Sequence, residues 1–383
     1  MITYDYIIIG AGASGLMLAD AMGNDVYFKD RSILLLDKET KKDNDRTWCY
    51  WEQGSGPFDT LIFKKWSQFY FGGQHYSANF EIKPYTYKMV RGIDFYDHYL
   101  GRIAGHGNID FVQEQVLHID ERKDEAAVTT GKQKYYAKQV FNSIVDYTAL
   151  GSQRRYPVLQ QHFLGWFIKT EKAVFDVDQA TFMDFSMPTK GDTRFMYVLP
   201  FSPTEALVEC TLFSETLLGD SGYETTITDY LNARFDTGEI RIQEKEKGRI
   251  PMTCYNFAMY NTDKVLGIGV AGGWAKPSTG YTFYGTYRKT DELVNHLKQG
   301  KPLSAFAKKK RFWYYDLLLL DILKRKNHKG GYIFESMFQK RRPQLILKFL
   351  DEQTNLWEDL LIISGCPKKE FISAFFRRLL RIR

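Results

Sequence analysis

The hydrophobic pattern opens with a short apolar strand that runs directly into a glycine loop. Residues 4–9 are apolar and β-prone, the loop is Gly10-Ala11-Gly12-Ala13-Ser14-Gly15, and residues 16–22 have the composition of a helix. A second apolar run, residues 32–37, ends in an acid, Asp37. Strand, tight loop, helix and second strand in this order predict a βαβ unit of a parallel sheet at the start of the chain.

The glycine loop has the spacing that binds the pyrophosphate of a dinucleotide. Gly10 permits the tight turn, Gly12 lets the backbone approach a pyrophosphate, and Gly15 lets the helix pack closely on the strand. The helix N-terminus offers free N–H groups to the phosphates. Asp37 lies about 20 positions after the last glycine, where an acid binds the ribose. We therefore predict dinucleotide binding here; the alternative is an ordinary glycine turn with Asp37 solvated at a strand end.

The rest of the chain alternates between strand and helix patterns. Strands are predicted at residues 68–71 and 74–77 around a Gly72-Gly73 turn, a helix at 93–104, and strands at 110–119, 125–130 and 134–145, the last of which ends near Ser143. Further strands are predicted at 161–168, 180–185, 194–200 and 205–213, a helix at 222–236, a strand at 265–269 followed by a helix from 287, and helices over most of 300–383.

This order of elements is typical of flavin enzymes, whereas a simple nicotinamide dehydrogenase more often shows an unbroken run of βαβ units. The predicted fold class is α/β: a glutathione-reductase-type FAD-binding (Rossmann-like) domain with an inserted antiparallel β-sheet substrate domain and a helical C-terminal region. Residues 1–65, 88–150 and 250–300 are assigned to the FAD-binding domain, residues 66–87 and 151–249 to the substrate domain, and residues 301–383 to the helical region.

A second glycine-rich loop follows the late strand. Residues 269–273 are all small, and residues 277–280 predict a turn that opens a helix. Small residues let the backbone approach a planar ring, and a helix N-terminus can face a flavin carbonyl oxygen. The alternative is a flexible surface loop, against which Trp274 and Tyr281 within it argue.

A carboxyl group stands in the middle of the apolar strand 205–213. Burial would raise the pKa of Glu209 and keep the group protonated, so that it can act as a general acid toward an apolar substrate. The alternatives are that its face is exposed to solvent or that it pairs with Arg194 on the neighbouring strand. Asp184 is a second acid of this kind, flanked by Met183 and Phe185.

The composition indicates a globular protein with reduced cysteines and no membrane-spanning segment. The chain has 383 residues, 44% hydrophobic, 16% aromatic and 26% charged, which is typical of a globular protein of more than one domain. Four scattered cysteines (Cys49, Cys210, Cys254 and Cys366) have no metal-ligand spacing, so we predict reduced thiols and no metal. We expect no signal peptide, and no apolar run reaches the ~18 residues needed to span a bilayer.

The net charge of +6 is concentrated at the C-terminus. Residues 301–383 hold 19 Lys and Arg against 8 Asp and Glu, interleaved with apolar positions such as Phe371, Phe375 and Leu379. A basic amphipathic helix is typical of proteins that bind a membrane surface, and a solvated helix face is the alternative. Because the basic residues lack a recognisable binding module, we expect no nucleic acid partner.

The chain resembles the bacterial flavin-dependent lycopene β-cyclases, which close the ionone rings of carotenoids. The resemblance runs in order over nearly the whole chain, and the strand pair Tyr197-Val198-Leu199-Pro200 and Val208-Glu209-Cys210-Thr211 is its most diagnostic part. The other stretches that carry it are the N-terminal glycine loop, Asp45-Arg46-Thr47-Trp48, Gln161-His162-Phe163-Leu164-Gly165, Met183-Asp184-Phe185, and the late loop through Pro277-Ser278-Thr279-Gly280-Tyr281.

The resemblance implies a redox-neutral isomerase that holds reduced FAD, with NAD(P)H as the expected reductant. An acid protonates the terminal alkene of lycopene or γ-carotene, an internal double bond closes the six-membered ring, and loss of a proton gives a β-ring. The catalytic acid of the family matches Glu209. The family usually has Asp at the next position, where this chain has Cys210, so a second carboxyl is missing there.

The resemblance also implies a set of contacts and a location. The predicted catalytic residues are Glu209, from the resemblance, and Asp184, from its place between apolar residues. The cofactor contacts are Gly10, Ala11, Gly12, Ala13, Ser14, Gly15, Asp37, Lys38, Arg46, Thr47, Val116, Ser143, Gly272, Gly280 and Tyr281; the substrate contacts, whose rings would stabilise a cation, are Trp166, Tyr197, Trp274 and Phe283. The expected location is the cytoplasm, peripherally on the inner face of the cell membrane. The alternative function is a flavin-dependent monooxygenase or a polyprenyl reductase acting on a lipid.

Overall fold

The chain forms two compact units, each assembled from three separate stretches of sequence. The computed structural model describes residues 2–306 and 310–380. Unit 1 comprises Met1–Asn44, Gly92–Tyr156 and Cys254–Arg311, and unit 2 comprises Asp45–Arg91, Pro157–Thr253 and Phe312–Arg383. This division differs from the domains read from the sequence in placing residues 45–65 and the C-terminal helices with the antiparallel strands. Residues 47–53 belong there because they pair with residues 85–91.

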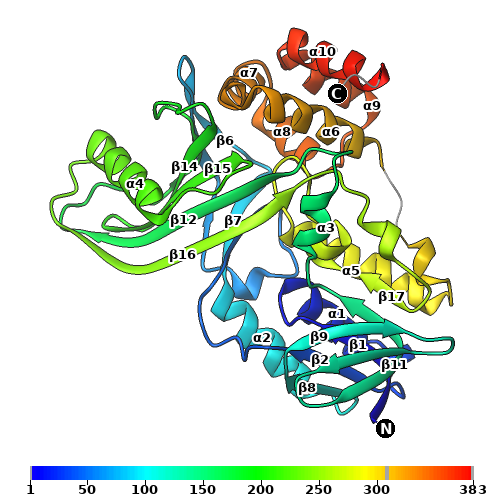
Figure 1. Ribbon diagram of the computed structural model, residues 1–383. Coiled ribbons are helices and arrows are strands. Elements are labelled where there is room, and N and C mark those ends of the chain that lie inside the picture. The colour runs from blue at the N-terminus through cyan, green and yellow to red at the C-terminus, as the bar shows by residue number, and fades with distance from the viewer. Residues whose placement is uncertain (1, 307–309, 381–383) are drawn as a thin grey trace. The chain divides into compact units, whose positions relative to one another are not determined.

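Unit 1 is built on a seven-stranded sheet in the order β8-β2-β1-β11-β10-β9, with β17 beside β11 (Figure 1). The strands β1, β2, β8, β11 and β17 run parallel to one another, and β10 pairs antiparallel with β11 and β9. The bounds are β1 Ile2–Ile9, β2 Ile33–Asp37, β8 Ile109–Gln113, β9 Val116–Glu121, β10 Ala126–Thr130, β11 Lys134–Asn142 and β17 Val265–Gly267.

The strand predicted at 110–119 is wrong as a single element, because the chain breaks between β8 and β9. Glu114 at the break is buried, and its carboxylate accepts a hydrogen bond from the Thr130 hydroxyl at 2.7 Å. This contact ties the break to the end of β10. The parallel strands bury an almost continuous apolar core that includes Ile7, Leu34 and Val140, as expected of strands covered on both faces.

Three helices of unit 1 pack together. They are α1 (Ala13–Asn24), α2 (Gly92–Ala104) and α5 (Phe283–Lys298), and α1 contacts both of the others. The helix predicted at 93–104 is confirmed as α2. The helix α5 begins earlier than the predicted residue 287, since its first turn is already closed by the hydrogen bond from the Thr286 N–H to the Thr282 carbonyl. The remaining elements of unit 1 are α3 (Tyr147–Ser152), η1 (Val26–Phe28), η3 (Phe257–Tyr260), η4 (Gly269–Gly272) and η5 (Leu303–Ala305).

Unit 2 contains a second seven-stranded sheet in the order β16-β12-β15-β14-β13-β5-β6. The helix α4 (Asp220–Arg234) covers one face, where Tyr223, Ile227 and Tyr230 pack on strand residues such as Leu164 and Val208 (Figure 1). The predicted antiparallel sheet is confirmed. The bounds are β5 Gln68–Gly72, β6 Ser77–Glu81, β12 Leu159–Thr170, β13 Gln179–Asp184, β14 Thr193–Ser202, β15 Glu205–Ser214 and β16 Ile240–Met252.

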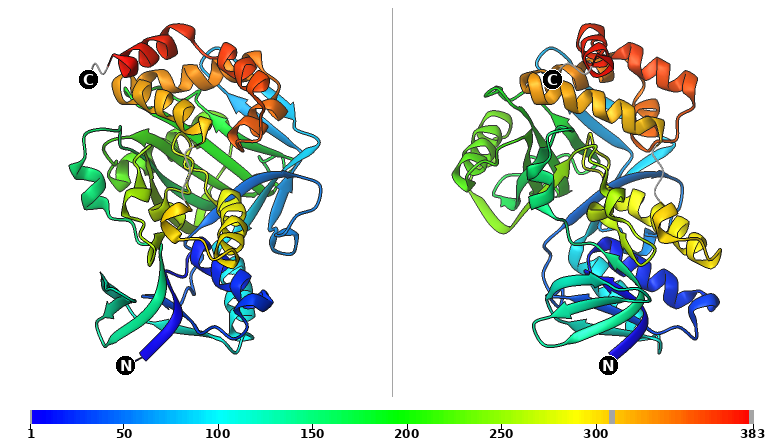
Figure 2. Two further views of the ribbon diagram at one scale, coloured as in Figure 1. Left: turned by 90° about the vertical axis from the view of Figure 1, so that its right-hand side faces the viewer. Right: turned by 45° about the vertical axis from the view of Figure 1, so that its right-hand side comes forward.

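A small sheet and the C-terminal helices complete unit 2. The small sheet has the order β3-β7-β4 (Thr47–Gln53, Tyr85–Arg91 and Lys64–Trp66), with η2 (Asp59–Leu61) before β4. The helices gather together in all the views of Figures 1 and 2 and are α6 (Arg311–Arg325), α7 (Gly330–Lys340), α8 (Pro343–Leu350), α9 (Leu356–Gly365) and α10 (Lys368–Leu379), with η6 (Asn327–Lys329) before α7. Within residues 2–306 and 310–380, no helix combines the length and the apolar character that crossing a bilayer requires.

Candidate active site

The N-terminal glycine loop of unit 1 has the geometry of a phosphate-binding turn. Gly10 has a φ of +95° and donates its N–H to the Leu36 carbonyl at 2.7 Å. A β-carbon on Gly10 would lie 2.0 Å from the Ser143 hydroxyl oxygen, which itself donates to the Ile9 carbonyl at 2.7 Å. The left-handed backbone and this close contact both require glycine. The predicted positions Gly10 and Ser143 are therefore neighbours.

The next two glycines have different roles. A β-carbon on Gly15 would lie 1.8 Å from the Gly10 carbonyl oxygen, so Gly15 sets how closely α1 packs on the turn. A β-carbon on Gly12, the residue that caps α1, would meet nothing within 4 Å. Among the residues described, no side chain caps α1 and its first turn holds no acid. Open space in front of free N–H groups fits a pyrophosphate.

Asp37 is fixed at the end of β2 beside the glycine loop. Its Oδ2 accepts the Ala11 N–H at 2.6 Å and its Oδ1 accepts the Glu39 N–H at 2.8 Å. The Lys38 carbonyl accepts from the Gln113 side chain at 3.2 Å. The structure thus brings Asp37 to the loop, as predicted from the spacing, and an acid held there can bind ribose hydroxyls. No contact joins the predicted residue Lys38 to the loop in the part of the chain that the structure describes. Val116 starts β9 and packs on the margin of the unit 1 core.

The late loop meets the glycine loop at the start of α1. Gly269 has a φ of +56°, and a β-carbon there would come within 2.5 Å of the Ser14 hydroxyl oxygen. Gly280 has a φ of +70° and donates its N–H to the Lys276 carbonyl at 2.8 Å, while the Tyr281 carbonyl accepts the Lys276 N–H at 2.8 Å. The turn at Gly269 therefore lies against the end of the N-terminal glycine loop.

Gly272 and Trp274 contact each other within the late loop, whereas Phe283 is buried between helices. A β-carbon on Gly272 would lie 3.0 Å from the Trp274 ring nitrogen, so these two residues are in contact within the loop. Phe283 is buried, and its ring lies 5.6 Å from that of Phe95 on α2. Phe283 is thus part of the packing between helices of unit 1, which is not the substrate contact predicted for it.

In unit 2, two carboxyl side chains meet over a glycine. Gly165 of β12 pairs with Glu209 of β15 on one side and with Glu246 of β16 on the other. A β-carbon on Gly165 would lie 3.2 Å from Cγ of Glu246 and 3.5 Å from Cβ of Glu209. The two carboxyls, which we call the carboxyl pair, hydrogen-bond each other. The Thr211 hydroxyl donates to Glu209, and the Thr47 hydroxyl donates to Glu246 at 2.7 Å.

The carboxyl pair holds a proton at neutral pH. Burial raises the pKa of Glu209 to about 7, and burial together with the neighbouring Glu209 charge raises the pKa of Glu246 well above its ordinary value. Burial, together with the charges of Glu209 and Glu246, also raises the pKa of the Cys49 thiol on β3. Because ionised carboxylates only accept hydrogen bonds, the contact requires a proton on Glu246, and Glu209 carries a second proton below about pH 7. The pair is therefore a proton source inside unit 2.

Aromatic rings continue from the carboxyl pair across the same face of the sheet. Tyr197 of β14 is the cross-strand neighbour of Glu209. The Tyr197 ring lies 5.2 Å from Phe195 and 6.3 Å from Phe182, and Phe195 lies 5.3 Å from Phe213. Such a face suits a hydrocarbon, and rings close to an acid can stabilise a cation. The structure places Glu209 and Tyr197 together, as predicted.

Two predicted residues lie on the opposite face, against α4. Trp166 packs in the cluster under α4, with the Lys245 ammonium 5.5 Å from its ring centre. Asp184 is fully buried and accepts hydrogen bonds from the Tyr230 hydroxyl and the Ser186 N–H, both at 2.9 Å, with Arg234 at 3.4 Å. Asp184 is an ion-paired carboxylate that fixes α4 to the sheet. Asp184 lies on the opposite face of the sheet from Glu209, so its surroundings do not support the predicted catalytic role.

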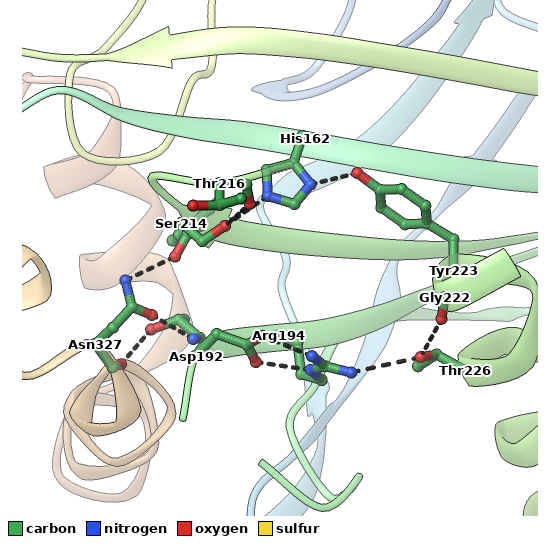
Figure 3. A network of polar contacts seen from close by, with 11 residues as sticks. His162, Asp192, Arg194, Ser214, Thr216, Gly222, Tyr223, Thr226 and Asn327 are labelled. Carbon is green, nitrogen blue, oxygen red and sulfur yellow. Dashed lines mark hydrogen bonds and ion pairs between the residues drawn. The ribbon is translucent and has the colours of Figure 1, made fainter. Parts of the chain in front are cut away.

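A buried histidine on the α4 face has no free nitrogen for catalysis (Figure 3). His162 lies 2.5 Å from the Tyr223 hydroxyl through Nδ1 and 2.7 Å from the Ser214 hydroxyl through Nε2. Ser214 donates its own proton to the Thr216 carbonyl at 2.6 Å, so it accepts from Nε2–H, and Tyr223 donates to Nδ1. Burial lowers the pKa of His162 to about 4, so the ring is neutral. His162 therefore fixes α4 to the sheet.

Arg194 belongs to the same network (Figure 3). Its guanidinium binds Asp192 through two hydrogen bonds of 2.7 and 2.6 Å and reaches the Thr226 hydroxyl of α4 at 3.4 Å. The pairing of Arg194 with Glu209, left open by the sequence, is therefore not formed. Glu209 faces away from this cation, so its proton is not displaced by a salt bridge.

Thr47 and Arg46, predicted as cofactor contacts, lie in unit 2. Thr47 begins β3 and donates to Glu246. The Arg46 guanidinium donates to the Asp45 carbonyl at 2.8 Å and lies 3.5 Å from the Lys247 carbonyl. Sequence reasoning missed Glu246, which alternates with Lys245 and Lys247 like an exposed strand. The signal that could have found it is Gly165, a residue without a side chain in an otherwise bulky strand.

Comparison with solved structures establishes the fold. A geranylgeranyl bacteriochlorophyll reductase-like protein from Thermoplasma acidophilum has a TM-score of 0.63 at 12% identity, covering 98% of this chain and 100% of that one. A flavoprotein/dehydrogenase from Cytophaga hutchinsonii has a TM-score of 0.62 at 14% identity, with coverages of 98% and 100%, and a flavin-dependent brominase has 0.59 at 15%, with 99% and 98%. The predicted fold class is confirmed as the α/β fold of FAD-dependent oxidoreductases, with mixed sheets and C-terminal helices.

Sequence comparison establishes the family. A lycopene β-cyclase of Paracoccus sp. is 30% identical over 146 residues, which is 37% of this chain and 37% of that relative. The chain thus matches little more than a third of the length of this curated relative. The family model described as lycopene cyclase protein matches residues 5–376. The resemblance seen in the sequence is confirmed, and the chain belongs to the lycopene cyclase protein family.

Proposed function

We propose that this protein converts the acyclic end groups of lycopene or γ-carotene to β-ionone rings, with Glu209 as the proton donor. Family membership implies carotenoid cyclisation. The observation that carries the finer proposal is the carboxyl pair, which holds a proton at neutral pH beside Tyr197. An alkene is a weak base, so its protonation requires a neutral acid in a place with little water.

The proposed reaction moves one proton in and one proton out. The Glu209 O–H bond breaks as a C–H bond forms at the terminal alkene, which leaves a tertiary carbocation. The electron pair of an internal double bond then forms the C–C bond that closes the six-membered ring. A C–H bond next to the new cation breaks, and its proton returns to the carboxyl pair. The Tyr197 ring beside Glu209 stabilises the positive charge through its π face. Substrate and product have the same mass.

The residues of unit 1 fit the cofactor that this proposal requires. Gly10 to Gly15 and Asp37 would hold the pyrophosphate and ribose of FAD, because the turn leaves N–H groups and space free at Gly12. In its reduced form, with NAD(P)H as the reductant, FAD would supply negative charge, which favours a carbocation. The fold is shared with flavoproteins, which supports this assignment.

The function is tested by incubating the purified full-length protein with FAD, a reductant and lycopene in vesicles. We expect β-ring products that have the mass of lycopene on chromatography and mass spectrometry, and no stoichiometric consumption of NAD(P)H. A flavin monooxygenase would add oxygen to the product, and a polyprenyl reductase would add hydrogen with matching NAD(P)H consumption. Either change of mass would overturn the proposed function in favour of that alternative.

We also propose that the C-terminal helices hold the protein on the inner face of the cell membrane. Large apolar side chains of α9 and α10 are exposed, with Trp357 at 70% and Leu379 at 65%. Basic residues flank them on α10, including Lys368 and Arg377. The full set, which we call the C-terminal apolar surface, is Leu356, Trp357, Leu360, Leu361, Ile372, Phe375, Phe376, Leu379 and Leu380. Exposed apolar residues beside cations fit a lipid surface that carries negative charge.

Replacing Trp357 and Phe376 with serine is expected to weaken membrane binding by at least about tenfold. Burial of each ring in lipid would contribute roughly 2 kcal/mol to the free energy of binding. The measurement is co-sedimentation with vesicles of phosphatidylcholine and phosphatidylglycerol. Val26→Ser serves as the control, because Val26 is 83% exposed but lies in unit 1. Unchanged binding of the double variant would refute this docking surface.

A further inference from the structure

Glu246 is a buried acid to which the proposed reaction assigns no role of its own. It lies across Gly165 from Glu209, hydrogen-bonds it, and is held by the Thr47 hydroxyl. We propose that Glu246 is a positioning residue for the reaction: its protonated carboxyl donates a hydrogen bond to Glu209 and stabilises the carboxylate that Glu209 becomes when it protonates the substrate. This inference rests on the proposed function and deepens it.

Burial assigns the two roles within the carboxyl pair. Glu246 is only 4% exposed, whereas Glu209 is half-buried and keeps part of its surface accessible. The more deeply buried carboxyl holds its proton more strongly, because a charge there is less well solvated. The more accessible carboxyl is the one that a substrate can touch. Glu246 is thus the acid that stays protonated and donates a hydrogen bond, and Glu209 is the acid that transfers its proton to the substrate.

The hydrogen bonds around the pair agree with these roles. Once Glu209 has lost its proton, its carboxylate accepts from the Thr211 hydroxyl and from Glu246. Two donors aimed in advance at a developing carboxylate act as donors in an oxyanion hole do, since they stabilise charge only as it forms. The Thr47 hydroxyl occupies an oxygen of Glu246 and keeps that carboxyl turned toward its partner.

The other groups around the carboxyl pair do not compete for its proton. Burial raises the pKa of the Cys49 thiol from β3, so the thiol is neutral at neutral pH. Tyr197 of β14 is the cross-strand neighbour of Glu209, and Glu244 lies two residues before Glu246 on the same face of β16. The Arg46 guanidinium approaches the carbonyl of Lys247 rather than either carboxyl. Neutral and acidic neighbours leave the pair protonated, which is the state the reaction needs.

The test compares Glu246→Gln with Glu246→Leu in the cyclisation assay over a range of pH. Glutamine keeps an N–H donor toward Glu209, whereas leucine has a similar size and no donor. We expect leucine to lower the rate roughly 10- to 100-fold and glutamine to retain most of the activity. The hydrogen bond from Glu246 lowers the pKa of Glu209, so its loss in Glu246→Leu should move the decline of activity to higher pH, while Glu246→Gln should decline near the wild-type pH.

The controls separate the failure of this inference from the failure of the proposed function. Glu205→Gln changes a carboxyl at the start of β15, where it lies 3.4 Å from the Lys169 ammonium, and should keep the wild-type rate and pH profile. If the wild type cyclises lycopene but Glu246→Gln loses as much as Glu246→Leu, with no shift of the pH profile, the inference is overturned. If the wild type does not cyclise lycopene, the proposed function fails. Infrared titration of the carboxyl band then still reports whether Glu209 titrates at higher pH in Glu246→Leu, and no shift overturns the inference.

Discussion

Glu209→Gln is expected to lower ring closure roughly 10²- to 10⁴-fold, the range that a general acid contributes. The amide has nearly the shape of the carboxyl and can keep its hydrogen bonds, but it cannot release a proton to an alkene. Purified protein, assayed for β-ring products from lycopene, gives the rate. Bound FAD and the melting temperature should match the wild type, because the amide keeps the size and the hydrogen bonds of the carboxyl that it replaces.

The pH profile of the wild type is a second test of whether Glu209 is the proton donor. Burial raises the pKa of Glu209 to about 7, so the protonated, active form predominates below that pH and is lost above it. Activity should therefore fall as the pH rises through about 7. An unshifted carboxyl would already be ionised at pH 6 and would give no such decline there. Persistent β-ring formation in Glu209→Gln would remove this residue from the mechanism and leave the family assignment intact.

Gly12→Ala is expected to lower FAD affinity by at least about tenfold, a free-energy change of about 1.4 kcal/mol or more, with little effect on folding. The added methyl group meets nothing within 4 Å in the protein, so it enters the open space where a pyrophosphate would approach the N–H groups of α1. Flavin fluorescence titration measures affinity, and thermal melting without FAD measures stability. FAD binding equal to that of the wild type would show that this loop is not the cofactor site.

Two other glycines provide matched comparisons for Gly12→Ala. In Gly15→Ala the new carbon lies 1.8 Å from a backbone oxygen, so this variant should lose about 1–3 kcal/mol of folding free energy or more, even without FAD. In Gly101→Ala the carbon meets nothing and the residue lies within the exposed face of α2, so stability should rise by about 0.5–1 kcal/mol and FAD affinity should not change. The three variants separate cofactor contact from packing.

Features set by local backbone chemistry could be predicted from the sequence. The turn at Gly10 and the acid at Asp37 depend on residues whose spacing is fixed by a single βαβ unit, and both are placed as expected. The alternation along β15 also separates Glu209 from its two neighbours in the strand. A period of two residues is enough for that, because successive side chains point to opposite faces.

Features set by strand register could not be predicted. Trp166 was expected to join Glu209, but it pairs with Val208, one position away, and so lies on the α4 face. Asp184 follows an irregularity in β13, which alternation alone does not reveal. Glu246 belongs to a strand whose alternating charges resemble a solvated surface, and its partner is 37 positions away in the chain, since they meet only through β12. A one-residue change of register moves a side chain to the other face.

The place of Glu209 within a sheet has a consequence for how a long polyene is handled. Its backbone is hydrogen-bonded on both sides, to β12 and β14, so the acid cannot swing on a hinge to follow its target. Under the proposed function, the reacting end would have to come to a fixed point, and this would select the carbon that is attacked. A molecule cyclised at both ends would then have to leave, turn end for end and bind again, so that a symmetric carotenoid would form in two separate binding events.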